Sequence, residues 1–369
     1  MTRPQTLNED DLYRTSSQYR LWSFSPESLA ALRQKTHSLA IARAQQYAEE
    51  SLRLVQRYLD QIRTTNDHFK WPVTVKATAV QYLARFYLSN SPITYPPKEI
   101  YKTVLFLAGK TEGTHMKLSE YGRRISTPVE EIMAPEYKIM QALRFTLDIR
   151  QPYRGLKGVL MELLNLAEGK VGKVDGVVTD GAEALQEEMM GLEAPADEAP
   201  TKWRMPANSN VEIKHITDRV NAAYSAARII LDGPALLTDA YFLYTPSQLL
   251  LAALQIADPP LTSFYLRTKL PLHSDLRPKI LATISACAEL LESYSPTQIL
   301  SKDARAALEM KLEGCRDPST RDLAGAHAVA KRGGDDSEAE EKARRKKVAR
   351  EKLARDGEDL FGPSLGGKG

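Results

Sequence analysis

A short helical pattern that is apolar on most sides occurs twice in this chain, each time entered from proline. The first is Tyr101–Lys110 (YKTVLFLAGK), which follows Pro96 and Pro97, and the second is Ser247–Ile256 (SQLLLAALQI), which follows Pro246. A helix that is apolar on most sides belongs at the centre of a bundle, where neighbouring helices cover every face. Two such helices in corresponding places predict two tandem helical repeats.

Apolar residues at alternating steps of four and three predict the helices around these two centres. Charged residues lie largely on the other side of the clearest stripe, which comprises Ala48, Leu52, Val55, Leu59 and Ile62. Pro72 and Pro152 are each well placed to start a following helix. We therefore expect an all-α fold with two five-helix repeats, the first over residues 44–150 and the second over 151–295.

The segments outside the repeats differ from them in composition. Residues 1–43 predict an N-terminal extension with a helix, 296–325 a C-terminal helix, and 326–369 a charged disordered tail. Residues 167–208 are rich in glycine, proline and acidic side chains, which predicts a flexible insertion in the second repeat. A short helix around Ala182–Met190 is expected within that insertion.

Composition excludes several broad classes of protein. Of the 369 residues 43% are apolar, and the formal net charge of +3 is too small to indicate a nucleic-acid binder by itself. No uninterrupted apolar run approaches the roughly 20 residues that span a membrane. Cys287 and Cys315 lie far apart in the sequence, which is typical of reduced thiols in a cytosolic or nuclear protein.

Enzyme motifs and metal-binding spacings are missing from the sequence. It contains no H-E-x-x-H, G-x-S-x-G or Walker motif, and its six histidines form no pair at i, i+4. Gly169–Gly176 (GKVGKVDG) superficially resembles a phosphate loop, but it lacks the Lys-Ser/Thr ending and follows a helical pattern. We expect no catalytic residue, no metal and no cofactor.

One glutamate lies within the apolar pattern of the fifth predicted helix, Val129–Asp148. Glu136 shares a helical face with apolar residues on both sides, namely Ile132, Ile139, Met140, Leu143 and Leu147. A carboxylate costs free energy in a closed core. The pattern therefore indicates that this face meets another molecule.

Several short motifs together resemble a known family. They are Ser16–Gln18, Trp22–Phe24 with Leu29–Arg33, Tyr82–Asn90 (YLARFYLSN), Phe106–Lys110 (FLAGK) and, above all, Leu237–Gln248 (LTDAYFLYTPSQ). The sequence resembles the cyclin family, and within it the cyclin H branch. The resemblance covers about Tyr13–Cys315 without Glu168–Asn208, and it implies two cyclin boxes of five helices each with flanking N- and C-terminal helices.

The resemblance implies a function without chemistry of the chain's own. Members of this branch are regulatory subunits of the CDK-activating kinase. The implied partners are a cyclin-dependent kinase 7-like kinase, a RING-finger assembly factor and general transcription factor IIH. The implied role is to support phosphorylation of the RNA polymerase II tail in the nucleus, with no membrane contact and no direct contact to nucleic acid.

The family's kinase-binding residues match particular positions in this chain. Cyclins hold the kinase with a lysine at the end of the third helix of the first box and a glutamate on the fifth, which correspond here to Lys110 and Glu136. Apolar contact positions of the family match Leu107, Met140, Phe145 and Leu147. The alternatives are a cation at a helix C-terminus for Lys110, a solvated residue for Glu136, and ordinary core packing for the apolar four.

Departures from the family limit what the resemblance implies. Ala44–Gln61 lacks the Met-Arg-Ala-Ile-Leu motif with which cell-cycle cyclins recruit substrates, and Thr111 replaces a large apolar residue. Two alternative functions remain open: a transcription factor IIB-like protein that binds DNA through a basic face, or a transcriptional cyclin with another kinase. The concentrated positive charge lies in Lys342–Arg355. Such a run is more often a solvated segment or a nuclear-import signal than a nucleic-acid-binding arm.

Overall fold

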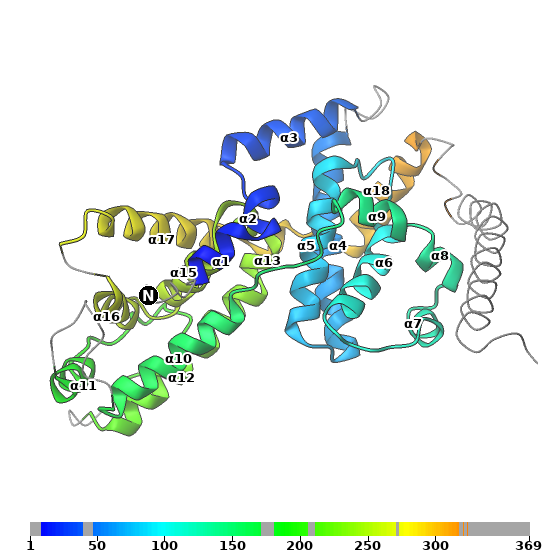
Figure 1. Ribbon diagram of the computed structural model, residues 1–369. Coiled ribbons are helices and arrows are strands. Elements are labelled where there is room, and N and C mark those ends of the chain that lie inside the picture. The colour runs from blue at the N-terminus through cyan, green and yellow to red at the C-terminus, as the bar shows by residue number, and fades with distance from the viewer. Residues whose placement is uncertain are drawn as a thin grey trace, which may run out of the picture.

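A computed structural model shows an all-helical protein within its described residues, which are 9–39, 47–170, 181–205, 211–270, 273–316, 320 and 323. Two groups of helices lie side by side, and the first helices of the chain lie over the junction between them (Figure 1). The predicted all-α fold is confirmed. None of the helices in this part of the chain is long and apolar enough to cross a membrane. The predicted charged tail, 326–369, lies outside the described residues.

The first repeat is built around α6, the helix that the sequence predicts to be central. This helix contacts α4, α5, α8 and α9. Four of its side chains, Ile100, Val104, Leu105 and Ala108, have no exposed surface. The helices of this repeat are α4 (Ala48–Phe69), α5 (Val73–Ser89), α6 (Pro97–Thr111), α7 (Leu118–Arg124), α8 (Val129–Met133) and α9 (Glu136–Ala142).

The predicted fifth helix, Val129–Asp148, is wrong in both continuity and length. Two short helices, α8 and α9, take its place, with Pro135 between them. Proline has no amide hydrogen, and its ring clashes with the preceding turn, so it interrupts a helix. The second piece ends at Ala142, and Arg144 and Phe145 then adopt left-handed φ angles of 53° and 55°. The chain therefore leaves the helix well before Asp148.

The second repeat has the same plan, with α15 at its centre in contact with α10, α12, α16 and α17. Thr245 and Gln248 cap the start of α15. Thr245 Oγ1 accepts a hydrogen bond from the Gln248 amide at 3.3 Å, and Gln248 Oε1 accepts one from the Thr245 amide at 2.8 Å. This capping box, with Pro246 in the first turn, explains why the TPSQ sequence begins a helix. The helices are α10 (Tyr153–Ala167), α12 (Ile213–Asp232), α13 (Pro234–Leu237), α14 (Ala240–Leu243), α15 (Pro246–Ala257), α16 (Pro259–Lys269) and α17 (Arg277–Glu292).

The segment 167–208, predicted as a flexible insertion, packs against the second repeat over its described part. The short helix expected there is present as α11 (Ala182–Met190), and it contacts α10 and α12 with Leu185 and Met189 fully buried. Trp203 is also buried, and its indole nitrogen donates a hydrogen bond to the His215 carbonyl at 3.0 Å. Leu185, Met189 and Trp203 are widely spaced among glycines, prolines and acidic residues. They form no regular apolar pattern, so the sequence does not predict their burial.

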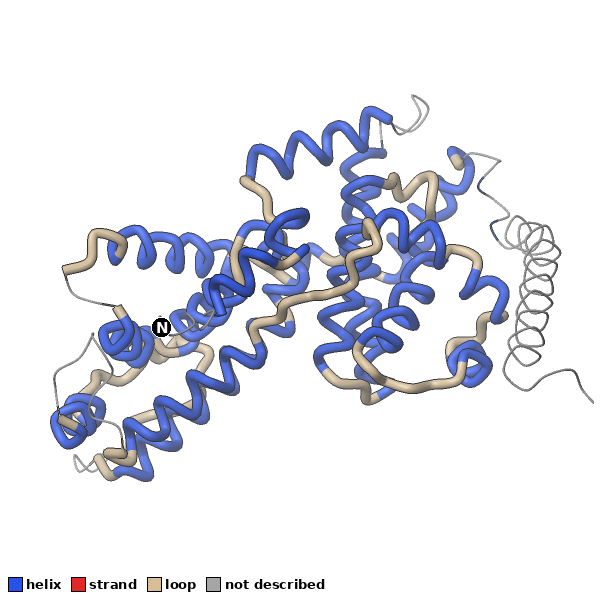
Figure 2. The backbone as a smooth tube through the Cα atoms, in the orientation of Figure 1, coloured by secondary structure: helices blue, strands red, loops and turns tan. Residues whose placement is uncertain are grey.

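Helices from both ends of the chain pack on the first repeat. α1 (Glu9–Thr15), α2 (Ser17–Trp22) and α3 (Pro26–Leu39) come first, and α3 contacts α5. After a 3₁₀ turn, η2 (Pro296–Gln298), the last helix of the described residues, α18 (Lys302–Cys315), returns from the second repeat to contact α4. The chain between α9 and α10 runs as an extended loop from one repeat to the other (Figure 2).

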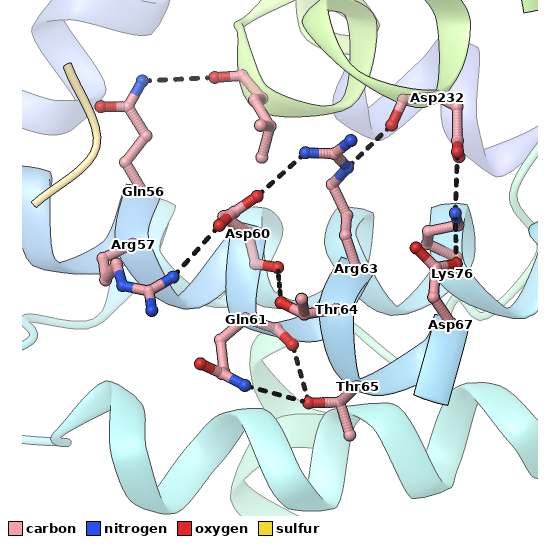
Figure 3. Close-up of polar contacts among 11 residues, drawn as sticks. Gln56, Arg57, Asp60, Gln61, Arg63, Thr64, Thr65, Asp67, Lys76 and Asp232 are labelled. Carbon is pink, nitrogen blue, oxygen red and sulfur yellow. Dashed lines mark hydrogen bonds and ion pairs between the residues drawn. The ribbon is translucent and has the colours of Figure 1, made fainter. Parts of the chain in front are cut away.

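Polar side chains of the first repeat reach the carboxyl end of α12 in the second. Figure 3 shows Lys76 of α5 between Asp67 and Asp232, with its Nζ 2.7 Å from a carboxylate oxygen of each. Arg63 of α4 donates from Nε to the backbone carbonyl of Asp232 at 2.8 Å. Cations at a helix carboxyl end are electrostatically favourable, and the buried Lys76 needs charged partners. These contacts fix the second repeat against α4 and α5.

The two cysteines are free and differ in accessibility, so we expect them to differ in reactivity. Burial in α17 raises the pKa of the Cys287 thiol to about 12, so almost none of it is the reactive thiolate at pH 8. Cys315 is partly exposed at the end of α18. A thiol reagent at pH 8 should modify Cys315 rapidly in the native protein and Cys287 only after unfolding. Cys315→Ser should abolish the rapid phase; two equally fast thiols would contradict the burial of Cys287.

Candidate functional site

Lys110 and Glu136 form an ion pair at the edge of the first repeat. Lys110 lies in the last turn of α6 and Glu136 is the first residue of α9, and the lysine Nζ contacts the glutamate Oε1. The Lys110 ammonium also lies 5.3 Å from the ring centroid of Phe106. The side chains are 44% and 20% exposed, respectively. The structure therefore brings together the two charged residues that the sequence selected.

This ion pair changes the interpretation of Glu136. The carboxylate is outside the core, at a helix start, and it has a partner within the chain. Both charges suit their helix ends, since a cation is favourable at a carboxyl end and an anion at an amino end. An exposed pair of this kind stabilises a fold by only about 0–1 kcal/mol. Folding alone thus gains little from it.

The four apolar residues of the predicted site differ in accessibility. Phe145 is 62% exposed, and Met140 and Leu147 are half-buried. Leu107 is only 4% exposed and belongs to the core of the repeat, which agrees with its core-packing alternative. We therefore leave Leu107 out of the surface considered below.

The sequence interpretation missed Tyr137, whose side chain is largely exposed. Glu136 and Tyr137 precede Met140 by about one helical turn, so the three share one side of α9. A signal was present in the sequence, because Tyr137 is an aromatic residue off the stripe formed by Ile132 and Ile139. Large exposed aromatic side chains are enriched where proteins bind one another.

The turn after α9 holds Phe145 in an unfavourable backbone conformation. Two consecutive left-handed residues other than glycine, Arg144 and Phe145, cost about 1–2 kcal/mol each. The Phe145 amide donates to the Met140 carbonyl at 2.9 Å, which closes the helix as a Schellman-type turn does. Strained, exposed residues often mark functional positions.

Tyr82 joins this turn to the end of α6. Its Oη donates a hydrogen bond to the Leu147 carbonyl at 2.6 Å and lies 3.2 Å from Thr111 Oγ1. Burial raises the pKa of Tyr82 to about 12, so the phenol remains a donor through the neutral range. Thr111, the residue after Lys110, is thus linked through the Tyr82 hydroxyl to Leu147, in the segment that follows Phe145.

We group the residues at the end of α6, on α9 and in the turn after it as the α6–α9 face, which comprises Lys110, Glu136, Tyr137, Met140, Phe145 and Leu147. It combines two exposed aromatic side chains, two half-buried apolar side chains and one ion pair, a composition typical of protein interfaces. Within the described ranges no three His, Cys, Asp or Glu side chains are placed to hold a metal ion. The face is suited to binding a protein.

Parts of this chain match a protein-family model and curated proteins. Residues 151–292 match the model of the cyclin C-terminal domain. The chain is 28% identical to Cyclin CCL1 of Saccharomyces cerevisiae over 291 residues, which covers 72% of this chain and 63% of that protein. The chain spans less than two thirds of the length of the first curated relatives it matches.

Two solved structures resemble the fold. A chain of the CAK complex of Chaetomium thermophilum, solved bound to ATP-gamma-S, is 32% identical with a TM-score of 0.70, and the match covers 89% of this chain and 96% of that one. A chain of the yeast TFIIK (Kin28/Ccl1/Tfb3) complex is 29% identical with a TM-score of 0.55, covering 76% of this chain and 100% of that one.

Proposed function

We propose that this chain, which belongs to the cyclin family and is of the cyclin H type, binds and activates a protein serine/threonine kinase of the cyclin-dependent kinase 7 type. The α6–α9 face is the surface that we propose for kinase binding. Its central feature is the ion pair between Lys110 and Glu136, and the exposed Phe145 follows the same short helix, α9. The pair gives the fold little stability, which favours a role in contact with a partner.

The proposed mechanism is a shift in the kinase's conformational population. A kinase is active when its strand lysine pairs with a glutamate of its mobile helix. A subunit that binds this arrangement better than the inactive one increases its population. The apolar side chains of the α6–α9 face supply contact area, while Lys110 and Glu136 set the register of docking. The chain itself transfers no phosphate in this scheme.

The proposed setting is the CDK-activating kinase within general transcription factor IIH, in the nucleus. The TFIIK neighbour is an assembly of Kin28, Ccl1 and Tfb3, and the second neighbour comes from a CAK complex. By analogy we propose a cyclin-dependent kinase 7-like kinase and a RING-finger assembly factor as partners, and the RNA polymerase II tail and kinase activation loops as substrates.

Reconstitution tests this proposal. The chain is co-expressed with a cyclin-dependent kinase 7-type kinase and the RING-finger factor, and phosphorylation of an RNA polymerase II tail peptide is measured. We expect the kinase with this chain to phosphorylate the peptide much faster than the kinase without it, and the chain alone to transfer no phosphate. Activation of a different transcriptional kinase only, or binding to DNA without any kinase, would support one of the two alternative functions instead.

Removal of the charged tail should leave kinase activation unchanged. A chain truncated after residue 325 keeps every residue of the α6–α9 face, and a charged tail of this composition cannot bury a core of its own. We expect kinase affinity and peptide phosphorylation within about twofold of the full chain.

A matched control for the tail is truncation after Leu300, which also removes α18. That helix buries Leu308 and Leu312, and its Glu309 accepts a hydrogen bond from Tyr58 of α4. We expect this shorter chain to melt at a lower temperature. A tenfold loss of activation on removing residues 326–369 alone would show that the tail takes part in the function.

A further inference from the structure

We propose that Trp22 and Gln18, on the N-terminal helix α2, are positioning residues that hold the segment 144–150 in the shape that presents Phe145 to the kinase. This inference rests on the proposed kinase-binding function and extends it to residues outside the α6–α9 face. Both side chains belong to the N-terminal extension, and neither was predicted as part of the site.

Trp22 contacts the start of the segment. Its indole Nε1 donates a hydrogen bond to Thr146 Oγ1 at 2.9 Å, and the Arg144 guanidinium carbon lies 5.2 Å from the centroid of its ring. Trp22 is itself buried. The ring thus contacts the residues on both sides of Phe145, whose own side chain is largely exposed. An exposed side chain contributes little to fixing its own backbone, so neighbouring contacts must do so.

Gln18 contacts the end of the same segment. Its Nε2 donates to the Arg150 carbonyl at 3.3 Å, and its Oε1 accepts from the Arg150 amide at 2.6 Å. The buried amide group therefore pairs with both backbone groups of a single linker residue, as a neighbouring strand would. Together with Tyr82, which holds the Leu147 carbonyl, α2 fixes the segment at its two ends.

Arg85 packs against the face of the Trp22 ring. The guanidinium carbon of this α5 residue lies 4.8 Å from the Trp22 ring centroid, and the residue is only 1% exposed. Its Nε and Nη1 have no hydrogen-bond partner among the described residues, and burial lowers its pKa to about 9. A buried cation with two unpaired nitrogens gains from contact with an aromatic face. The contact ties the position of the Trp22 ring to the first repeat.

Other contacts hold the N-terminal extension in place independently of the segment 144–150. The Phe24 amide donates to the Phe242 carbonyl at 2.8 Å, and the guanidinium of Arg33 pairs with both carboxylate oxygens of Asp239. A substitution that weakens only the Trp22–Thr146 hydrogen bond should therefore leave α2 docked. This separates a positioning effect from loss of the whole extension.

The test uses Trp22→Phe in the full chain, since phenylalanine keeps an aromatic ring against Arg85 and removes the indole donor. Gln18→Leu removes both hydrogen bonds to Arg150 at similar size. Arg20→Ala is the matched control, because Arg20 is exposed on the same helix. Hydrogen exchange is measured at the Phe145 and Thr146 amides, which donate to the Met140 and Leu143 carbonyls and make no hydrogen bond with Trp22. We expect at least threefold faster exchange in Trp22→Phe and Gln18→Leu, and no change in Arg20→Ala.

Kinase affinity supplies the second measurement, as a double-mutant cycle with Phe145→Ala. Trp22→Phe should weaken kinase binding at least threefold in the natural background and should cause no further loss in Phe145→Ala, because it acts through Phe145. Equal losses in both backgrounds, or unchanged exchange at Phe145 and Thr146, would overturn the inference. If the natural chain bound no kinase, the proposed function would fail, and the exchange measurement would still decide whether α2 holds the segment.

Discussion

Replacing Asp258 by alanine is expected to lower the free energy of unfolding by about 3–5 kcal/mol, because it leaves a buried arginine without its counter-ion. The Arg219 and Asp258 side chains are each 1% exposed. Arg219 Nε lies 2.7 Å from Asp258 Oδ2, and Nη2 lies 2.8 Å from Oδ1. Asp258 Oδ1 also accepts a hydrogen bond from the Leu261 amide at the start of α16, so the substitution removes a helix cap as well.

The same arginine joins the insertion to the second repeat. Its Nη1 and Nη2 donate to the carbonyls of Leu192 and Glu193 at 3.2 and 2.7 Å, and its guanidinium carbon lies 5.0 Å from the Trp203 ring centroid. Loss of Asp258 should therefore loosen residues 191–204 in addition to lowering global stability. Protease cleavage within this stretch should accelerate in Asp258→Ala.

Denaturant unfolding of three variants tests the role of this pair. Asp258→Ala should be the least stable, and Arg219→Met with Asp258→Ala should recover part of the loss, since the double variant buries no unpaired charge. The surface control is Glu120→Ala, which breaks an exposed i, i+4 pair with Arg124 and should cost under about 1 kcal/mol. If Asp258→Ala cost no more than Glu120→Ala, the pair would not hold the repeat together.

Local apolar patterns account for the parts of the fold that could be predicted from the sequence. α6 and α15 are recognisable because each is apolar on most sides, and α15 also carries its capping box within the sequence TPSQ. The break at Pro135 was missed because the apolar spacing of Ile132 and Ile139 continues across it. Periodicity reports which side chains face the core, and it does not report a missing amide hydrogen.

The site was only partly predictable, because its contacts join distant residues. Lys110 was selected through the family resemblance, and Glu136 through both that resemblance and its apolar neighbours, but their pairing spans 26 positions. The contacts of Trp22 with Thr146 and of Gln18 with Arg150 span 124 and 132 positions. No local period encodes such contacts. Leu107 shows a related limit, since it lies one turn before Lys110 on α6, yet its side chain is 4% exposed and belongs to the core.

Reversing the charge of Glu136 is expected to weaken kinase binding at least tenfold, about 1.4 kcal/mol, with little effect on the fold. In Glu136→Lys a second cation lies beside Lys110 and faces the kinase where an anion is expected. The Lys110–Glu136 pair is partly exposed, so its loss should change the free energy of unfolding by less than about 1 kcal/mol. Thermal melting of the chain alone and kinase affinity should therefore respond differently. Glu183→Lys is the matched control, since Glu183 is an exposed acid in the first turn of α11 at the other end of the molecule (Figure 1).

Because Lys110 and Glu136 bind each other, the double reversal Lys110→Glu with Glu136→Lys separates their two roles. It restores an ion pair within the chain, with a small penalty because each charge now opposes its helix dipole. If the kinase recognises the two charges, the double variant should have a melting temperature close to that of the natural chain. It should still bind the kinase at least tenfold more weakly, because both charges facing the partner are reversed. If the double variant regained full affinity, the two residues would serve only to hold α6 against α9, and kinase recognition would depend on the apolar side chains around Phe145.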